Sequence, residues 1–295
     1  MSEPKLSVVV ASVNGFPYVG QCLDALAERA PGAEVIVADS TDGETRRRLQ
    51  EGWPAVKLLS FEEQQTIPEL RAAGIFVAGA PLVAVIEDHC RVTPEWADAA
   101  VEAHEQGHAV VGGPIRNVVT DRARDWAAFF CEYSAFMEPL PAGEAKALTG
   151  MNVAYDRKAI AAMEDLLRKG RWEGWLHARL QERGIGLYCA SDMVLEHDKD
   201  FGLGEFLSQR WHYSRSYAGM RNETLGRRRY LYALGAPLLP PVLYWRMARN
   251  VFSRSRRRRE FLLATPLILL YVCVWAAGEA VGYAFGGGRS LLKVR

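Results

Sequence analysis

The stretch that decides the fold is Ala80-Pro-Leu-Val-Ala-Val-Ile-Glu-Asp-His-Cys90. It holds a continuous apolar run, residues 82–86, that ends abruptly in three polar residues. A short apolar run between turn residues is typical of a buried strand in a parallel sheet. Open α/β sheets bind ligands at the carboxyl ends of their strands. Glu87, Asp88 and His89 stand at that end and are all able to bind a metal, so the stretch predicts a divalent cation and a phosphorylated ligand.

The same residues also fit a solvated strand end followed by a helix, because Thr93-Pro-Glu95 is a fair helix start. The surrounding pattern is an alternation of short apolar runs with helical stretches, which predicts an α/β fold with a mostly parallel sheet flanked by helices. The expected strands cover 6–12, 33–39, 56–59, 82–87, 108–112, 150–155 and 186–190, the expected helices cover 18–29, 44–51, 68–77, 95–106, 121–137, 157–168 and 173–183, and 142–147 is expected to be a loop.

Charge is divided unevenly along the chain. Residues 1–205 carry 20 lysines and arginines against 32 aspartates and glutamates, whereas residues 206–259 carry 13 arginines and one acid, Glu223. Such asymmetry indicates an anionic partner for the tail, either a membrane or a nucleic acid. The five cysteines are widely spaced and form no CxxC pair, which is typical of a protein in a reducing cytosol rather than of a disulfide framework or a zinc ribbon.

Two apolar segments favour the membrane as that partner. The first, residues 230–245, is broken by prolines and is expected to lie in the interface or to re-enter, whereas the second, residues 261–285, is long enough to span a bilayer. The arginine run Arg246–Arg259 lies between them, and a basic run flanked by apolar segments of membrane length is more typical of a membrane protein than of a nucleic-acid patch. Basic clusters stay on the cytoplasmic side, so the sequence predicts attachment to the cytoplasmic face of the cell membrane.

The order of these signals resembles the family 2 glycosyltransferases, which transfer sugars from nucleotide donors and have the GT-A fold. The resemblance covers about residues 5–225 and begins with the strand Val8-Val-Val-Ala-Ser-Val-Asn14. It continues with Val35-Ile-Val-Ala-Asp39 and Pro68-Glu-Leu-Arg71-Ala-Ala-Gly74-Ile75. By position, the resemblance implies that Asp39 contacts the nucleotide base and that Arg71 reaches a phosphate or a sugar hydroxyl.

The resemblance also implies a cation site. Glu87-Asp88-His89 stands where the family has Asp-x-Asp, and Val194-Leu195-Glu196-His197 resembles the family's strand ending in a histidine. The implied ligands are Glu87, Asp88, His89 and His197, with Asp88 also contacting the donor. An imidazole in place of the last carboxylate shifts the expected preference from Mg²⁺ toward Mn²⁺.

Three further stretches resemble the parts of the family that hold the sugar and the acceptor. Val111-Gly-Gly113 and Leu148-Thr-Gly-Met-Asn152 imply sugar or acceptor contacts at Gly113 and Asn152. In Arg171-Trp172-Glu173-Gly-Trp175-Leu176-His-Ala-Arg179-Leu180, the register implies that Glu173 is the catalytic base, although Trp172 replaces the acid that usually precedes it. Trp172 and Trp175 are expected to stack on sugar or lipid faces.

Gln209-Arg-Trp-His-Tyr-Ser-Arg215 resembles the helix that lies over the nucleotide in membrane-bound members, which implies donor contacts at Arg210, Trp211 and Arg215. The expected domains are a GT-A domain over 1–225 and a membrane-associated helical segment over 226–295. The expected function is inverting transfer from a nucleotide-sugar donor to a lipid-linked or polysaccharide acceptor, with a divalent cation and without nucleic acid. The alternatives are a nucleotidyltransferase, although residues 12–17 lack the lysine of a phosphate loop, and a GT-A-like membrane adaptor without catalysis.

Overall fold

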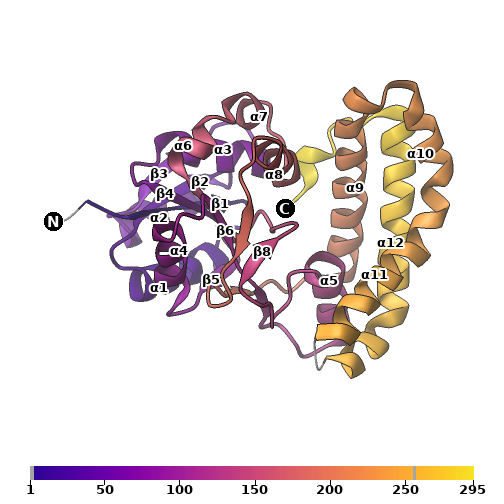
Figure 1. Ribbon diagram of the computed structural model, residues 1–295, viewed down its shortest axis with the longest axis horizontal. Helices are drawn as coiled ribbons and strands as arrows, with labels where there is room; N and C mark the ends of the chain where they lie inside the picture. The colour runs from indigo at the N-terminus through magenta and orange to yellow at the C-terminus, as the bar shows by residue number, and fades with distance from the viewer. Residues whose placement is uncertain (1–2, 255–256) are drawn as a thin grey trace. The chain divides into compact units, whose positions relative to one another are not determined.

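The structure is a computed structural model that describes residues 3–254 and 257–295 (Figure 1). Ser255 and Arg256, which belong to the predicted arginine run, lie outside the described residues. The chain forms two compact units. The first consists of Met1–Val118 and Phe136–Lys199, and the second consists of Val119–Ala135 and Asp200–Arg295.

The first unit is built on an eight-stranded sheet in the order β3-β2-β1-β4-β9-β6-β10-β8. The pairs β2–β3, β1–β2, β1–β4 and β6–β10 are parallel, whereas β9 is antiparallel to β4 and β6, and β8 is antiparallel to β10. The strands are β1 (Leu6–Ser12), β2 (Glu34–Asp39), β3 (Lys57–Ser60), β4 (Leu82–Glu87), β6 (Val110–Gly112), β8 (Gly143–Ala145), β9 (Val153–Asp156) and β10 (Leu187–Cys189). The expected α/β fold with a mostly parallel sheet is confirmed.

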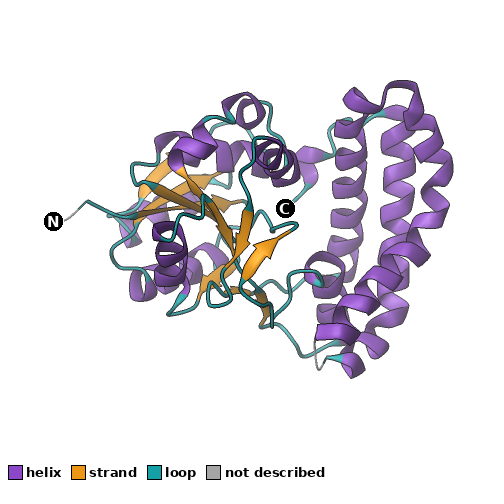
Figure 2. Cartoon of the chain, viewed as in Figure 1, coloured by secondary structure: helices purple, strands orange, loops and turns teal. Residues whose placement is uncertain are grey.

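Helices surround this sheet, as Figure 2 shows. Their apolar faces meet the strands in one core, which includes Val9, Val85 and Leu176. The helices are α1 (Tyr18–Arg29), α2 (Gly43–Gly52), α3 (Ile67–Val77), α4 (Trp96–Glu105), α6 (Arg157–Ala161), α7 (Glu164–Arg168) and α8 (Glu173–Glu182). The helix expected over 157–168 is two short helices, because the chain turns at Ala162 and Met163.

A second, three-stranded sheet brings two histidines together. Its order is β5 (Cys90–Val92), β11 (Leu195–His197) and β7 (Ile115–Asn117). Because β11 pairs antiparallel with β5, His197 lies opposite Cys90 and therefore beside His89. The sheet thus extends the polar end of β4 with a strand that lies about a hundred residues further along the sequence.

The second unit is helical. Its main helices are α5 (Ala123–Tyr133), α9 (Leu203–Leu225), α10 (Arg229–Gly235), α11 (Leu239–Arg254) and α12 (Arg258–Phe285), with short 3-10 turns at Gly226–Arg228, Ala236–Leu238 and Leu291–Lys293. Among the described residues, α12 is the one helix that is long and apolar enough to cross a membrane. The boundary predicted between residues 225 and 226 falls at the end of α9, within this unit. As a division of function, it stays a prediction.

Candidate active site

Three charged side chains from three elements meet at the carboxyl end of β4. Arg71 belongs to α3, Glu87 is the last residue of β4, and Glu173 is the first residue of α8. Arg71 forms an ion pair with Glu87 through Nη2, and its Nη1 donates to Oε2 of Glu173 at 3.1 Å. One guanidinium therefore lies between two carboxylates, which come from distant parts of the sequence.

Little water reaches this trio, since the side chains of Arg71, Glu87 and Glu173 are only 10%, 13% and 21% exposed. Burial alone would lower the pKa of Arg71, because it disfavours the charged form. The two carboxylates outweigh burial and raise that pKa above its ordinary value. Arg71 is thus a permanent cation, and it pairs with both Glu87 and Glu173.

Local sequence signals hold the trio in place. Thr66 caps α3, because its hydroxyl accepts from the amide of Glu69 while the Glu69 carboxylate accepts from the amide of Thr66. Gly150 lies in the loop before β9 and brings the backbone of that loop against the trio. A Cβ atom at Gly150 would lie 2.4 Å from both Arg71 Nη1 and Glu173 Oε2, so any other residue there would displace these two side chains.

The two tryptophans of the predicted acceptor site lie in different environments. Trp172 is buried, and the Arg71 guanidinium carbon lies 5.7 Å from the centre of its ring. Trp175, on the first turn of α8, is partly exposed and so retains a face for a ligand. Trp172 is therefore part of the wall behind the trio, and of the two only Trp175 fits the expected stacking role as it stands.

A buried polar pair joins α8 to β9. The Tyr155 hydroxyl, on β9, lies 2.8 Å from Nε2 of His177 on α8. Burial, together with the nearby charge of Arg71, lowers the pKa of His177 to about 4. His177 is thus neutral at physiological pH. No sequence motif indicates this pair.

Asp88 has its contacts inside the protein. Oδ2 accepts from the amides of Val13, Asn14 and Gly15 at 2.9, 2.6 and 3.3 Å, and Oδ1 accepts from the Asn14 side chain at 2.7 Å. Burial would raise the pKa of Asp88, but hydrogen bonds from His89 and Asn14 outweigh it and lower that pKa. The carboxylate therefore fixes the turn after β1, and these contacts do not support the donor or cation contact expected of it.

The other expected cation ligands form a smaller group. His89 Nε2 lies 3.7 Å from Glu87 Oε2, and the His89 and His197 rings meet edge to face with centres 4.9 Å apart. Burial, His89 and Lys199 keep the pKa of His197 well below its usual value, so its imidazole is neutral. Across the described residues, no three His, Cys, Asp or Glu side chains are arranged to hold a metal. The cation site that the sequence implies at Glu87 and His89 therefore stays a prediction.

Three further residues that were predicted to contact a ligand make close contacts with other residues of the first unit. Asp39 is buried and accepts from the hydroxyls of Ser12 and Thr41. The Asn152 amide donates to the carbonyls of Pro114 and Met193, and its oxygen accepts from the Trp96 indole at 2.8 Å. Gly113 permits close approach, as expected, but to the Met193 backbone, which a Cβ would meet at 2.0 Å. Their ligand contacts stay predictions.

The residues predicted to cover the nucleotide lie in the second unit, on α9. Arg210 is buried, forms an ion pair with Glu132 of α5, and lies 5.0 Å from the Trp275 ring centre. Arg215 Nε donates to the Gly286 carbonyl at 3.2 Å, and Trp211 is partly exposed. Within this unit Arg210 joins two helices, which is a structural role that the sequence did not indicate.

Comparisons with known proteins agree with this arrangement. The sequence profile of the family "Glycosyl transferase family 2" matches residues 7–162, which is more than half of the chain. No curated protein matches in sequence. A solved mannosyltransferase from Pyrobaculum calidifontis, PcManGT in complex with GDP-Man and Mn²⁺, superposes with a TM-score of 0.58 at 15% identity, over 94% of this chain and 87% of that one. S. aureus TarS 1–349 gives 0.49 at 13% identity, over 94% and 90%.

The matched region contains β1, Asp39, Arg71 and the Glu87–Asp88–His89 turn. The likeness to the mannosyltransferase concerns the fold of the chain, in accord with the mostly parallel sheet described above. The profile match and the fold together give the identity: this chain is a glycosyltransferase with a GT-A-like fold, and it belongs to glycosyl transferase family 2.

Proposed function

We propose that the protein transfers a sugar, with inversion at the anomeric carbon, from a nucleoside diphosphate sugar to a hydroxyl acceptor. The observation that carries the proposal is the position of Glu173. Its carboxylate is partly exposed, stands on the first turn of α8 and is held by Arg71 beside the carboxyl end of β4. That edge of an α/β sheet is where ligands of such folds bind.

The proposed reaction moves one proton to Glu173 and one electron pair to the leaving diphosphate. Glu173 takes the proton of the acceptor hydroxyl while the oxygen of that hydroxyl bonds to the anomeric carbon. The bond from this carbon to the diphosphate breaks, and its electron pair leaves on the phosphate oxygen. Attack opposite the leaving group inverts the configuration. Arg71 supports the step because its hydrogen bond to Glu173 holds that carboxylate in place beside the carboxyl end of β4.

The leaving diphosphate requires positive charge. A divalent cation would supply it when bound, and Glu87 and His89 are the side chains that would hold this ion. Asp39, Arg71, Arg210, Trp211 and Arg215 remain the proposed donor contacts, with Trp175 and Asn152 on the acceptor side. We leave Asp88 out of the cation site because its two oxygens are occupied by the turn after β1.

We also propose that residues 226–295 attach the enzyme to the cytoplasmic face of the cell membrane, where the acceptor is lipid-linked or a polysaccharide. The support is compositional and geometric. Arg227, Arg228, Arg246 and Arg249 are exposed, and so are several leucines of the same segment. Arginine beside exposed leucine suits the boundary between anionic head groups and acyl chains, and it suits a nucleic acid less well.

The direct test measures products. The purified full chain is incubated with a panel of nucleoside diphosphate sugars and with lipid or glycan acceptors, and free nucleoside diphosphate is quantified. NMR of the glycoside then reports the anomeric configuration. Release of a nucleoside diphosphate with an inverted product supports the proposal. A retained configuration rejects the inverting step, pyrophosphate release from a nucleoside triphosphate favours a nucleotidyltransferase, and the absence of any turnover favours a membrane adaptor.

A further inference from the structure

The surroundings of α12 decide how the tail meets a membrane. One face of this helix is buried inside the second unit, whereas the other carries exposed leucines such as Leu262 and Leu263. The buried face consists of Phe261, Ala264, Ile268, Tyr271, Val272, Ala276, Gly278, Glu279, Gly282 and Tyr283. A helix that is surrounded by lipid has no such protein-covered face along its whole length.

The helix that covers much of this face is α9, which runs beside α12 in the same direction. Phe206 meets Tyr271 with ring centres 4.6 Å apart. Further along, a Cβ at Gly278 would lie 2.1 Å from Ser214 Oγ, and one at Gly282 would lie 2.5 Å from the Arg215 carbonyl. The contacts advance in the same order along both helices, and Figure 1 shows the two side by side. A path through a bilayer for α12 would therefore carry α9 with it.

α9 is unsuited to such a path. Its sequence has charged side chains along its whole length, including Glu205, Arg215, Arg221 and Glu223. Arg221 donates to the Tyr283 hydroxyl at 2.6 Å, so this polar face lies directly against α12. Charged side chains in the hydrocarbon are unfavourable, and a helix that carries several of them does not span a bilayer.

The beginning of α12 is covered by α5, a helix that begins with charged residues. Phe261 packs against Phe130 of α5, with ring centres 5.3 Å apart, and the Arg257 guanidinium lies 5.2 Å from the Trp126 ring centre. The first turn of α5 carries Arg124 and Asp125, and the former forms an ion pair with Asp200 at 3.2 Å. Both halves of α12 are thus flanked by helices that carry charged side chains.

An apolar surface that faces outward lies instead on α10 and α11. Leu231 and Leu234 lie on α10, Leu238 lies in the 3-10 turn that follows, and Val242 and Trp245 lie on α11. These five residues recur every three or four positions along this continuous helical path, and we name them the outer stripe. Their exposed fractions are 70%, 79%, 71%, 41% and 58%. Exposed arginines adjoin this stripe, and the Arg249 guanidinium lies 5.4 Å from the Trp245 ring centre.

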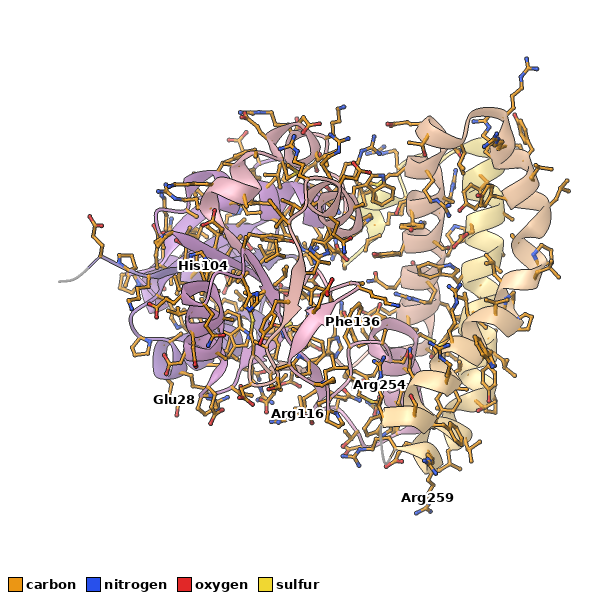
Figure 3. All side chains as sticks on the ribbon, in the orientation of Figure 1. Glu28, His104, Arg116, Phe136, Arg254 and Arg259 are labelled. Atoms are coloured by element: carbon orange, nitrogen blue, oxygen red, sulfur yellow. The ribbon has the colours of Figure 1, made fainter. Side chains whose placement is uncertain are left out.

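We propose that α12 does not cross the membrane, and that the second unit lies on an anionic bilayer surface with the outer stripe in the acyl boundary. The inference rests on the membrane attachment proposed above and specifies its geometry. The occupant follows from charge, because Arg227, Arg228, Arg246 and Arg249 flank the stripe and would contact acidic head groups. Arg254 and Arg259, which lie at one end of the bundle (Figure 3), are then on the same side of the membrane as the end of α12.

Cysteine labelling distinguishes the two topologies. Ser253→Cys and Arg289→Cys place one thiol before and one after α12, each in a full chain carrying Cys273→Ser, which removes the one fully exposed native thiol among the described residues. In sealed vesicles with the cytoplasmic face outward, a membrane-impermeant maleimide should label both sites equally with and without detergent. A site that reacts only after detergent is added would show that α12 spans, and would overturn the proposal.

Vesicle binding tests the outer stripe. The full chain should co-sediment with phosphatidylcholine vesicles that contain roughly one-third phosphatidylglycerol, and Leu234→Glu/Leu238→Glu should weaken binding about tenfold or more. Phe76→Glu is the matched control, because Phe76 is an exposed apolar residue on α3 of the first unit. Unchanged binding of the double variant overturns the stripe. The proposal is also overturned if the wild-type chain forms a dimer without lipid and the double variant is monomeric, because a second copy of the chain would then cover the outer stripe. Failure of the wild-type chain to bind rejects the membrane attachment itself.

Discussion

At the scale of single residues, the sharpest prediction concerns Glu173. Glu173→Gln keeps the size of the side chain and an oxygen that accepts from Arg71, so the fold and donor binding should be retained. The amide cannot take a proton, and turnover should fall by ~10²–10⁴, the usual contribution of a general base. Steady-state release of the nucleoside diphosphate measures the loss, and calorimetric donor binding measures what is kept.

Glu182 provides the matched control, since it lies on the same helix and forms a surface pair with Arg179 at 3.2 Å. Glu182→Gln should behave as wild type in both assays. Near wild-type turnover in Glu173→Gln would remove Glu173 from the base role and leave the trio with a structural role only.

The cation proposal rests on two residues, Glu87 and His89. Chelation should weaken binding of the nucleotide sugar, and Mn²⁺ should restore it better than Mg²⁺, because an imidazole ligand suits the former. His89→Asn should reduce the advantage of Mn²⁺ over Mg²⁺, and because His89 is buried against the His197 ring, some loss of melting temperature in the metal-free state is expected as well. Titration calorimetry with and without chelator measures both effects, and donor binding indifferent to chelator would exclude the cation from the donor site.

His177 predicts a pH dependence of stability. Its pKa is about 4 in the folded chain, against 6.5 for an ordinary histidine. Between these values the unfolded chain binds a proton that the folded chain does not, so the free energy of unfolding falls as the pH falls. The loss amounts to about 3 kcal/mol across that window. Urea unfolding at several pH values should show a shallower decline in His177→Gln, and equal slopes would contradict the assignment.

At the scale of elements, packing between α9 and α12 depends on glycine. A Cβ at Gly282 would lie 2.5 Å from the Arg215 carbonyl and 2.7 Å from Ala218 Cβ, and neither is the end of a flexible side chain. Gly282→Val should therefore destabilise the second unit by about 1–3 kcal/mol, as overpacking does. At Gly235 a Cβ would meet nothing within 4 Å, so Gly235→Ala should be neutral or stabilising. Urea denaturation compares the two, and equal midpoints would contradict close packing at Gly282.

Elements with strong local patterns were predicted well from the sequence. The apolar runs at β1, β2 and β4 and the amphipathic stretch of α1 are confirmed, because burial on both faces of a strand or on one face of a helix leaves a period in the sequence. β8 was expected to be a loop. Its Gly-Glu-Ala sequence has no such period, and its strand conformation comes from pairing with β10, about forty residues away. The antiparallel direction of β9 likewise depends on pairing with strands that are distant in the sequence.

The candidate site follows the same division. The sequence placed Arg71, Glu87 and Glu173 on the correct elements, but it did not predict the contact between them, because they are 16 and 102 residues apart. It also missed Gly150 as the residue that admits this contact, although the surrounding stretch 148–152 was singled out. Asn152 and Asp88 have the residue types of ligand contacts, and the sequence did not reveal that Asn152 also donates to the Met193 carbonyl and that Asp88 also accepts from the Val13 amide.

At the scale of the whole molecule, the second unit depends on the end of the chain. A chain that stops after Leu225 retains α5 and α9 but lacks α12, against which both pack. We expect such a truncated protein to lose helix content in the second unit and to self-associate through the uncovered apolar faces. Circular dichroism and size-exclusion chromatography measure these effects. A monomeric product with one sharp melting transition would show that α9 needs no partner.

The second unit is built from two separate parts of the sequence, which affects how the protein folds during its synthesis. α5 ends at Tyr133, and α12 ends at Phe285, 152 residues later (285 minus 133). At ~5–20 residues per second, a ribosome needs roughly 8–30 s to make the intervening chain. Phe130 therefore lacks its partner Phe261 while the ribosome makes the intervening residues, which include the later part of the first unit. The apolar face of α5 should therefore stay exposed on the nascent chain until translation is nearly complete. We expect a ribosome-bound chaperone to bind this face.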